Sequence, residues 1–264
     1  MSPERVLGEM AGLGIEATEF GPDGFLPDSP VDKAAALAAY GLKAVGGFVP
    51  TLLHNPDHDP APAVERALDS FAAVGGDVLV LAASSGQDGY DSRPVLAETG
   101  WQTMFESLDR LKDLAAARGV RACLHPHVGT MVETADDVRR VLAGSSIPLC
   151  LDTGHLAIGG SDPVELARRH ADRVAHVHAK DVDLALAKRV QDGRLTYRQA
   201  VAEGLYTVLG AGDIDFRAIV AALNRAGFDG WYVMEQDTIL AGEPAGAGPL
   251  EDVKSSIAFL KALV

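Results

Sequence analysis

Short apolar runs rich in β-branched residues alternate along this chain with longer alanine- and leucine-rich segments of helical periodicity. The short runs predict strands at residues 15–20, 43–49, 78–83, 121–127, 148–152, 174–178 and 231–235. The longer segments predict helices at residues 31–40, 63–74, 101–118, 135–142, 163–170 and 216–226. Strands separated by helices imply crossover connections, so the pattern predicts an α/β fold with a parallel sheet.

A closed barrel explains this pattern better than a dinucleotide-binding sheet. No Gly-x-Gly-x-x-Gly opens the first strand–helix unit, and 264 residues suit a barrel of about 250 residues. We therefore expect a TIM (β/α)8-type barrel, with residues 1–264 forming a single domain.

The beginning of the chain does not fit a complete barrel. Residues 3–13 read as a helix, with Ser2 as its cap and Pro3 at its first position, whereas an eight-stranded barrel begins with a strand. A barrel short of one strand exposes two unpaired edges. We expect that the chain starts inside a longer one; the alternative is that another segment closes the gap.

Two long segments follow predicted strand ends, where barrel enzymes build their sites. Residues 50–62 form a loop rich in Pro and Asp, and residues 181–215 contain a predicted helix near 184–201. Loops of this length serve as lids, binding loops or subunit contacts. For the second segment, a binding role and a subunit contact are equally good interpretations.

Composition narrows the functional classes. The formal net charge of −14 disfavours nucleic acid and anionic membranes as partners. The two cysteines, Cys123 and Cys150, lack the spacing of a disulfide scaffold or a thiolate zinc site. No apolar stretch approaches the roughly 20 residues of a membrane span, and no signal peptide is recognisable, so we expect a cytoplasmic protein.

Polar residues cluster where the last four predicted strands end, so their side chains should converge in the barrel mouth. Those able to bind a metal or move a proton are His125, His127, Asp152, His155, His176, His178, Lys180, Asp181, Glu235 and Asp237. Imidazole and carboxylate donors without thiolates suit Mn²⁺, Co²⁺, Fe²⁺ or Zn²⁺. His178 lies nearer the strand exit than His176 and is the better ligand.

Five strings carry a resemblance to a known family: HPHVGTMVET, LCLDTGH, HVHAKD, GAGDIDF and GWYVMEQD. In this order and spacing the chain resembles the xylose-isomerase-like sugar isomerase and epimerase superfamily, and within it the inosose dehydratase family. The likeness extends from Glu9 to about Asp237 and is densest after Arg121. DTGH and HVHAKD are common across the superfamily, whereas HPHVGT with GAGDIDF is more specific to the dehydratase-like branch.

The resemblance implies one bound divalent metal ion. Mn²⁺ or Co²⁺ is the first expectation, with Zn²⁺, Fe²⁺ and Mg²⁺ as alternatives. Its ligands would be Asp152, His178 and Glu235, and the family's first glutamate falls on His125, with His127 as the rival position. This departure removes one of the two metal-bound carboxylates that epimerases use. It therefore favours an elimination, in which one base removes a proton and one acid helps hydroxide leave.

The resemblance also suggests roles for other polar residues. Glu235 is the expected base. Lys180 would stabilise the enolate or assist the leaving hydroxyl; alternatively it is a solvated lysine paired with Asp181. His155 is a candidate acid, or it caps the next helix.

Three residues are candidates for substrate binding. They are His54, His127 and Glu133. For Glu133, capping of the helix that begins after Thr134 is an equally good explanation. The Gly210–Phe216 segment lacks the Lys-Ser/Thr of a phosphate-binding loop, and we expect Asp215 to cap the helix that begins at Phe216.

The predicted function is that of a metal-dependent dehydratase acting on a keto-inositol or related keto-sugar by enolisation and loss of water. The alternatives are a divalent-metal-dependent ketose isomerase or epimerase, and a catalytically silent barrel subunit. We expect a small polyol or keto-sugar substrate without a phosphate, no nucleic-acid or membrane partner, and a homodimer.

Overall fold

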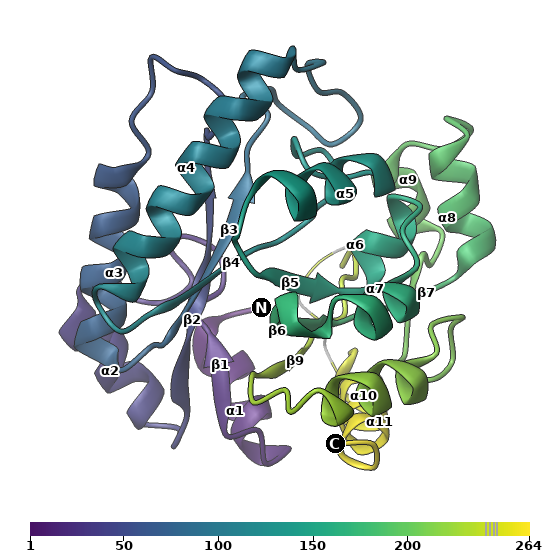
Figure 1. The fold of residues 1–264 in the computed structure, drawn as a ribbon. Coiled ribbons are helices and arrows are strands. Elements are labelled where there is room, and N and C mark those ends of the chain that lie inside the picture. The colour runs from purple at the N-terminus through teal and green to yellow at the C-terminus, as the bar shows by residue number, and fades with distance from the viewer. Residues whose placement is uncertain (241, 243, 245, 247) are drawn as a thin grey trace.

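The computed structural model describes residues 1–240, 242, 244, 246 and 248–264. Within these residues a nearly closed barrel of seven parallel strands occupies the centre of the molecule (Figure 1). In spatial order the strands are β1 (Ala17–Glu19), β2 (Lys43–Thr51), β3 (Val78–Ala83), β4 (Arg121–Leu124), β5 (Leu149–Asp152), β6 (Val174–Ala179) and β9 (Tyr232–Met234). Each strand predicted from the sequence is present, and the predicted α/β barrel is confirmed.

Helices cover the outside of the strands. They are α1 (Pro3–Gly12), α2 (Pro30–Ala38), α3 (Ala61–Val74), α4 (Glu98–Ala116), α5 (Ala135–Gly144), α6 (Thr153–Ile158), α7 (Pro163–Arg169), α8 (Leu184–Gln191), α9 (Tyr197–Ala202), α10 (Phe216–Arg225) and α11 (Leu250–Lys261). Ser2 caps α1 and Asp215 caps α10, as predicted, each accepting a hydrogen bond from a first-turn N–H. The main core lies between strands and helices.

A second, smaller core fills the inside of the barrel. It consists of Val45, Val78, Val80, Cys123, Cys150 and Ala175 from β2 to β6. Because successive side chains of a strand point to opposite faces, each strand from β2 to β6 supplies both cores. The inner core closes the barrel interior, so polar side chains at the strand ends face a mouth rather than a channel.

The segment after β6 differs from its prediction. The single helix expected near residues 184–201 is two helices, α8 and α9, separated by a turn in which Gly193 has a φ of 67°. Two short antiparallel strands, β7 (Asp181–Val182) and β8 (Tyr206–Thr207), bring the ends of this segment together. Asp192, Gly193 and Thr196 provide the stop and start signals that break the helix.

The barrel is open between β1 and β9. Neither strand pairs with the other within the described residues, and no described strand precedes α1. A groove of about 630 Å³ runs along this seam, lined mainly by apolar side chains of β1, β9, α1 and α11. None of the described helices has the length and hydropathy that crossing a membrane requires. The expectation that the chain starts inside a longer one stays a prediction.

Candidate active site

A cavity of about 480 Å³ opens at the carboxyl ends of the strands. Its lining combines polar side chains from several strand ends with an apolar and aromatic rim. The lining residues are Glu19, Phe48, Tyr90, His125, His127, His178, Lys180, Tyr197, Arg198, Val201, Glu235, Asp237, Thr238 and Ile239. The volume is suitable for a small ligand such as a six-membered polyol ring.

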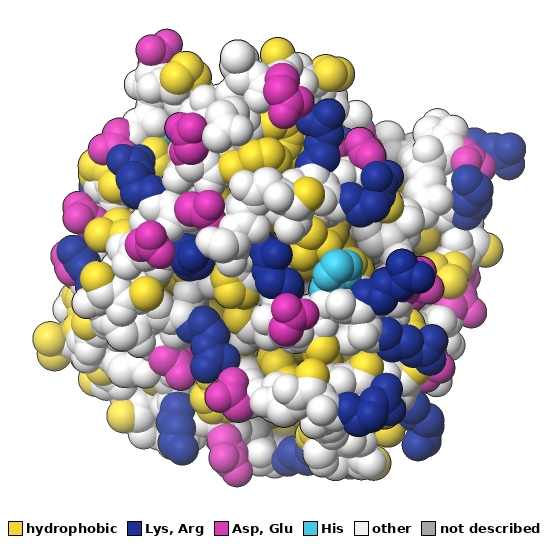
Figure 2. All heavy atoms as spheres, in the orientation of Figure 1, with side chains coloured by type: hydrophobic (Ala, Val, Ile, Leu, Met, Phe, Trp, Pro, Cys, Tyr) yellow, Lys and Arg dark blue, Asp and Glu magenta, His cyan; other side chains and the backbone are white. Residues whose placement is uncertain are grey.

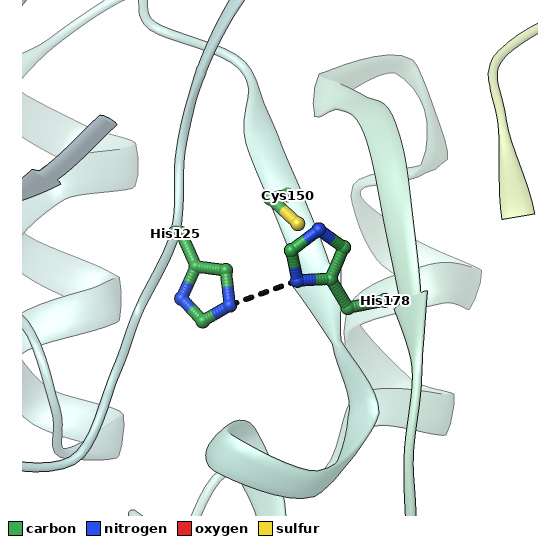
Figure 3. A group of neighbouring side chains, drawn as sticks. All are labelled: His125, Cys150 and His178. Carbon is green, nitrogen blue, oxygen red and sulfur yellow. Dashed lines mark hydrogen bonds between the residues drawn. The ribbon is translucent and has the colours of Figure 1, made fainter. Parts of the chain in front are cut away.

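His125, Asp152 and His178 meet at the bottom of this cavity. The Nε2 atom of His125 lies 3.1 Å from the Asp152 carboxylate and 3.1 Å from Nδ1 of His178. Figure 3 shows the two imidazoles pointing toward one another from neighbouring parts of the barrel, with the Cys150 thiol beside His178. His125, Asp152 and His178 stand where β4, β5 and β6 leave the sheet, and all three are buried.

Glu235 completes this cluster from the end of β9. Its Oε1 lies 3.4 Å from Nδ1 of His178, and the Asp152 carboxylate lies 3.6 Å from the same nitrogen. The donor atoms of Asp152, His178 and Glu235 all fall within 4.8 Å of one another. Four residues predicted as metal ligands are therefore brought together by the fold.

The side chains in and around the cluster carry more negative than positive charge. Burial alone would raise the pKa of Asp152, but Lys180 and hydrogen bonds from His125 and His178 lower it well below its usual range. Burial would likewise raise the pKa of Glu235, and His178 and Lys180 lower it. Burial opposes protonation of His178, yet Glu235 and Glu19 raise its pKa well above its usual range. The cluster therefore favours additional positive charge.

The chemistry of these donors fits a divalent cation. Two carboxylates and two imidazoles form a hard-to-borderline donor set of the kind that Mn²⁺, Co²⁺, Fe²⁺ and Zn²⁺ accept. A cation bound there would replace the proton on Nδ1 of His178 and offset the surplus negative charge. Cys150 is a poor ligand in comparison, because burial raises the pKa of its thiol well above its usual range.

Lys180 projects into the cavity beside these carboxylates. Its Nζ lies 2.7 Å from Glu235 Oε2, 3.1 Å from Asp237 and 3.4 Å from Asp152. Burial would lower its pKa, but Asp152, Glu235 and Asp237 raise it well above its usual range, so the side chain is an ammonium ion. The alternative in which Lys180 is solvated and paired with Asp181 is wrong. The Asp181 carboxylate instead accepts backbone N–H groups of Gly210, Gly212 and Ile214.

His127 and His155 form a neutral pair at the side of the cavity. Their ring centroids are 3.7 Å apart. Burial, together with nearby His125 and Lys180, lowers the pKa of His127 to about 3. Burial, His127 and Lys180 lower the pKa of His155 well below its usual range. Because Nδ1–H of His127 donates to the carbonyl of Val128 at 2.7 Å, its Nε2 is the ring atom left as an acceptor.

Two of the predicted substrate-binding residues lie outside the cavity lining. His54 follows β2 and is half-buried, and burial lowers its pKa. Glu133 accepts a hydrogen bond of 2.8 Å from the Gly129 N–H and braces the loop after β4. Thr134 and Asp137 form the cap of α5, so capping is not the work of Glu133.

Glu19 also lies at the site, although it was not among the residues predicted from the sequence. It ends β1 and lines the cavity, and its Oε1 lies 2.8 Å from His176 Nε2 and 3.0 Å from His178 Nε2. The signal was available, because Glu19 is a polar residue at a strand end like the others. It was missed because it stands in a short strand with no second metal-binding residue beside it.

Comparison with known proteins gives a consistent set of relatives. A family model described as xylose isomerase-like TIM barrel matches residues 7–263. Inosose dehydratase of Geobacillus thermodenitrificans is 33% identical over 259 residues, which cover 94% of this chain and 85% of that protein. Rhizopine catabolism protein MocC of Rhizobium meliloti is 34% identical over 260 residues, covering 95% of this chain and 78% of that protein.

A solved structure of L-ribulose 3-epimerase superimposes with a TM-score of 0.71 at 18% identity. The superposition covers 98% of this chain and 88% of that one. At this identity the likeness shows a shared fold.

Proposed function

The chain belongs to the xylose isomerase-like TIM barrel family and is an enzyme, and we propose that it removes water from a keto-inositol or a closely related keto-sugar. The identity with inosose dehydratase over most of both chains supports a dehydratase. The observation that carries the proposal is the meeting of His125, Asp152, His178 and Glu235 beside the Lys180 ammonium, in a cavity that suits a six-membered ring.

We propose that His125, Asp152, His178 and Glu235 hold one divalent cation, with Mn²⁺ and Co²⁺ as the first candidates. A cation held by these four residues would supply Lewis-acid chemistry, favouring negative charge on an oxygen of the substrate. The family resemblance places His125 where epimerases of the superfamily have a second metal-bound carboxylate. With one carboxylate fewer at the reacting centre, the site suits proton removal and hydroxide loss better than proton removal and return.

Glu235 and Lys180 supply the proton transfers. The Glu235 carboxylate takes the proton from the carbon next to the ketone, and a carbon–carbon double bond forms as the neighbouring carbon–oxygen bond breaks. The Lys180 ammonium gives a proton to the departing hydroxide, which leaves as water. The Glu235 carboxyl then returns its proton to the Lys180 amine across 2.7 Å, which restores both groups.

The two neutral histidines have separate tasks in this scheme. The free Nε2 of His127 accepts a hydrogen bond from a ring hydroxyl, because its other nitrogen is held by Val128. His155 is not in the cavity lining, and its Nε2 lies 3.2 Å from Lys180 Nζ. Since its lowered pKa keeps it neutral, we assign the acid to Lys180 and a positioning role to His155.

An assay with 2-keto-myo-inositol tests the proposal. The protein is incubated with the substrate and Mn²⁺ or Co²⁺, and the ultraviolet absorbance of the unsaturated or dione product is followed. We expect turnover that is lost in chelator and restored by added metal. A product that keeps all its hydroxyl groups but has changed stereochemistry would instead establish an epimerase, and absence of both reactions would support a silent barrel.

Substitution of Lys180 tests its assigned role. We expect Lys180→Met to lower kcat by about 10²- to 10⁴-fold, because the departing hydroxide loses its proton donor. Lys188→Met on α8 is the matched control, since Lys188 is exposed and paired with Asp192 outside the cavity. Equal rates for the two variants would remove Lys180 from the mechanism.

A further inference from the structure

Glu19 makes a long-range contact that the proposed chemistry does not use. Its side chain crosses the barrel from β1 to β6, and one carboxylate oxygen lies within hydrogen-bond distance of two imidazoles, His176 at 2.8 Å and His178 at 3.0 Å. The Glu19 side chain is 12% exposed and both histidines are buried. A buried carboxylate is stable in such a place only when donors satisfy it.

The contact determines which nitrogen of His178 keeps its proton when a cation replaces the proton on Nδ1. Because Nε2–H donates to Glu19, the ring presents Nδ1 toward Asp152 and Glu235, the side on which the donor atoms converge. An imidazole ligand needs a free lone pair on the metal-binding nitrogen, and a carboxylate on the opposite nitrogen fixes the tautomer and raises ligand basicity.

His176 also contacts the Glu19 carboxylate. Its Nε2 lies near the same oxygen of Glu19, and its Nδ1 has no hydrogen-bond partner among the described residues. This leaves Glu19 as its hydrogen-bond partner in the described part of the chain. His176 therefore holds Glu19 against β6 and restricts the rotamers from which the carboxylate can reach His178.

We propose that Glu19 is a positioning residue, which orients His178 and sets its tautomer so that Nδ1 faces the metal-binding cluster. His176 is the lateral support that holds the carboxylate in place. The proposal deepens the proposed function and rests on it for the identity of the cluster as a metal site. Under this proposal β1 contributes to the site through Glu19, although none of the four predicted ligands lies on β1.

Three variants distinguish the effect of the negative charge of Glu19 from the effect of its hydrogen bonds, and include a control at a nearby glutamate. Glu19→Gln keeps an acceptor oxygen and a similar shape but removes the negative charge. Glu19→Leu removes both the charge and the acceptor. Glu16→Gln is the matched control, because Glu16 is an exposed glutamate three positions earlier and does not line the cavity.

Calorimetric titration with Mn²⁺ provides the first measurement. We expect binding to weaken by roughly 10- to 100-fold in Glu19→Gln, and by more in Glu19→Leu, since loss of such partners of ligating histidines has effects of this size. Glu16→Gln should bind as the unsubstituted protein does. Unchanged affinity in both Glu19 variants overturns the proposal.

Nuclear magnetic resonance of the imidazole nitrogens provides a second measurement that does not depend on metal or turnover. In the metal-free protein the Nε2 protons of His176 and His178 should give resolved low-field signals, which Glu19→Leu abolishes and Glu16→Gln retains. Retention of both signals in Glu19→Leu overturns the proposal. If the unsubstituted protein binds no divalent ion while these signals depend on Glu19, the proposed metal site fails and the contact between Glu19 and His178 stands.

Discussion

Lys180 and Asp181 are adjacent in the sequence, yet they serve different parts of the molecule. Lys180 points into the cavity toward Glu235 and Asp237, whereas the Asp181 carboxylate binds the backbone of the loop that contains Gly210 and Gly212. Neighbouring residues of an extended segment project to opposite sides, so a charge pair close in sequence need not be a pair in space.

The protonation of His127 predicts an acid-dependent loss of stability. Its pKa in the folded protein is about 3, against about 6.5 when unfolded, so between these values the unfolded chain binds the additional proton. Stability therefore rises with pH across this window and is lost as pH falls from about 6.5 toward 3. We expect His127→Asn to show a shallower fall in unfolding free energy between pH 6.5 and 4 in urea titrations. The same slope in both proteins would contradict this.

At the residue scale the sequence predicted which polar residues meet at the strand ends better than it predicted the contacts that hold them. His125, Asp152, His178 and Glu235 follow conspicuous apolar runs; the strand-end pattern placed them among ten candidates, and the family resemblance narrowed the ten to these four. Glu19, His176 and Lys180 contact residues that lie 25 to 159 positions away in the sequence. Such contacts form only when the whole barrel folds. His54 and Glu133 were selected for residue type and lie outside the cavity lining.

At the scale of elements, the alternation of strands and helices was predicted, whereas the short elements α6, β7 and β8 and the twelve-residue helix α11 were not. The buried strands and helices such as α3 and α4 have many apolar positions at a regular spacing. In contrast, α6 has six residues and β7 and β8 have two each, which is too few for any periodicity to be visible. These short elements exist because tertiary contacts hold them, with α6 packing against α8 and β6.

The loop that follows β8 depends on one glycine. A Cβ atom at Gly212 would overlap the Asp181 carboxylate and the Thr207 hydroxyl. We expect Gly212→Ala to lower the unfolding free energy by about 1–3 kcal/mol, because the loop must move away from the carboxylate that satisfies its N–H groups. Gly12→Ala in α1 is the control, since nothing lies within 4 Å of its added Cβ and it should be neutral or stabilising in denaturant titrations. Equal losses in both variants would contradict this account.

At the scale of the whole molecule, the surface charge bears on the choice of partners and the strand topology bears on local stability. The net charge is −14, and on the face shown in Figure 2 acidic and basic side chains are intermixed with small apolar patches.

Because the barrel is open, we expect the strands to differ in how well their backbone amides are protected from hydrogen exchange. β3 pairs with strands on both sides, whereas β1 and β9 each pair on one side within the described residues. We expect backbone amides of β1 and β9 to exchange with solvent at least about tenfold faster than those of β3, because edge strands open by local fluctuation. Mass-spectrometric hydrogen exchange on short peptides measures this directly, and uniform protection would show that the seam is closed in solution.

Glu19 ends β1, and Glu235 directly follows β9. The two acidic side chains that flank His178 thus belong to the two strands with a free edge. Occupancy of the cluster by Mn²⁺ should therefore contribute to folding as well as to catalysis, by about 2.7 kcal/mol when the free ion is at 100 times its Kd. The gain should concentrate in these two strands, because a bound ion would connect them across the open seam between β1 and β9 in the described part of the chain.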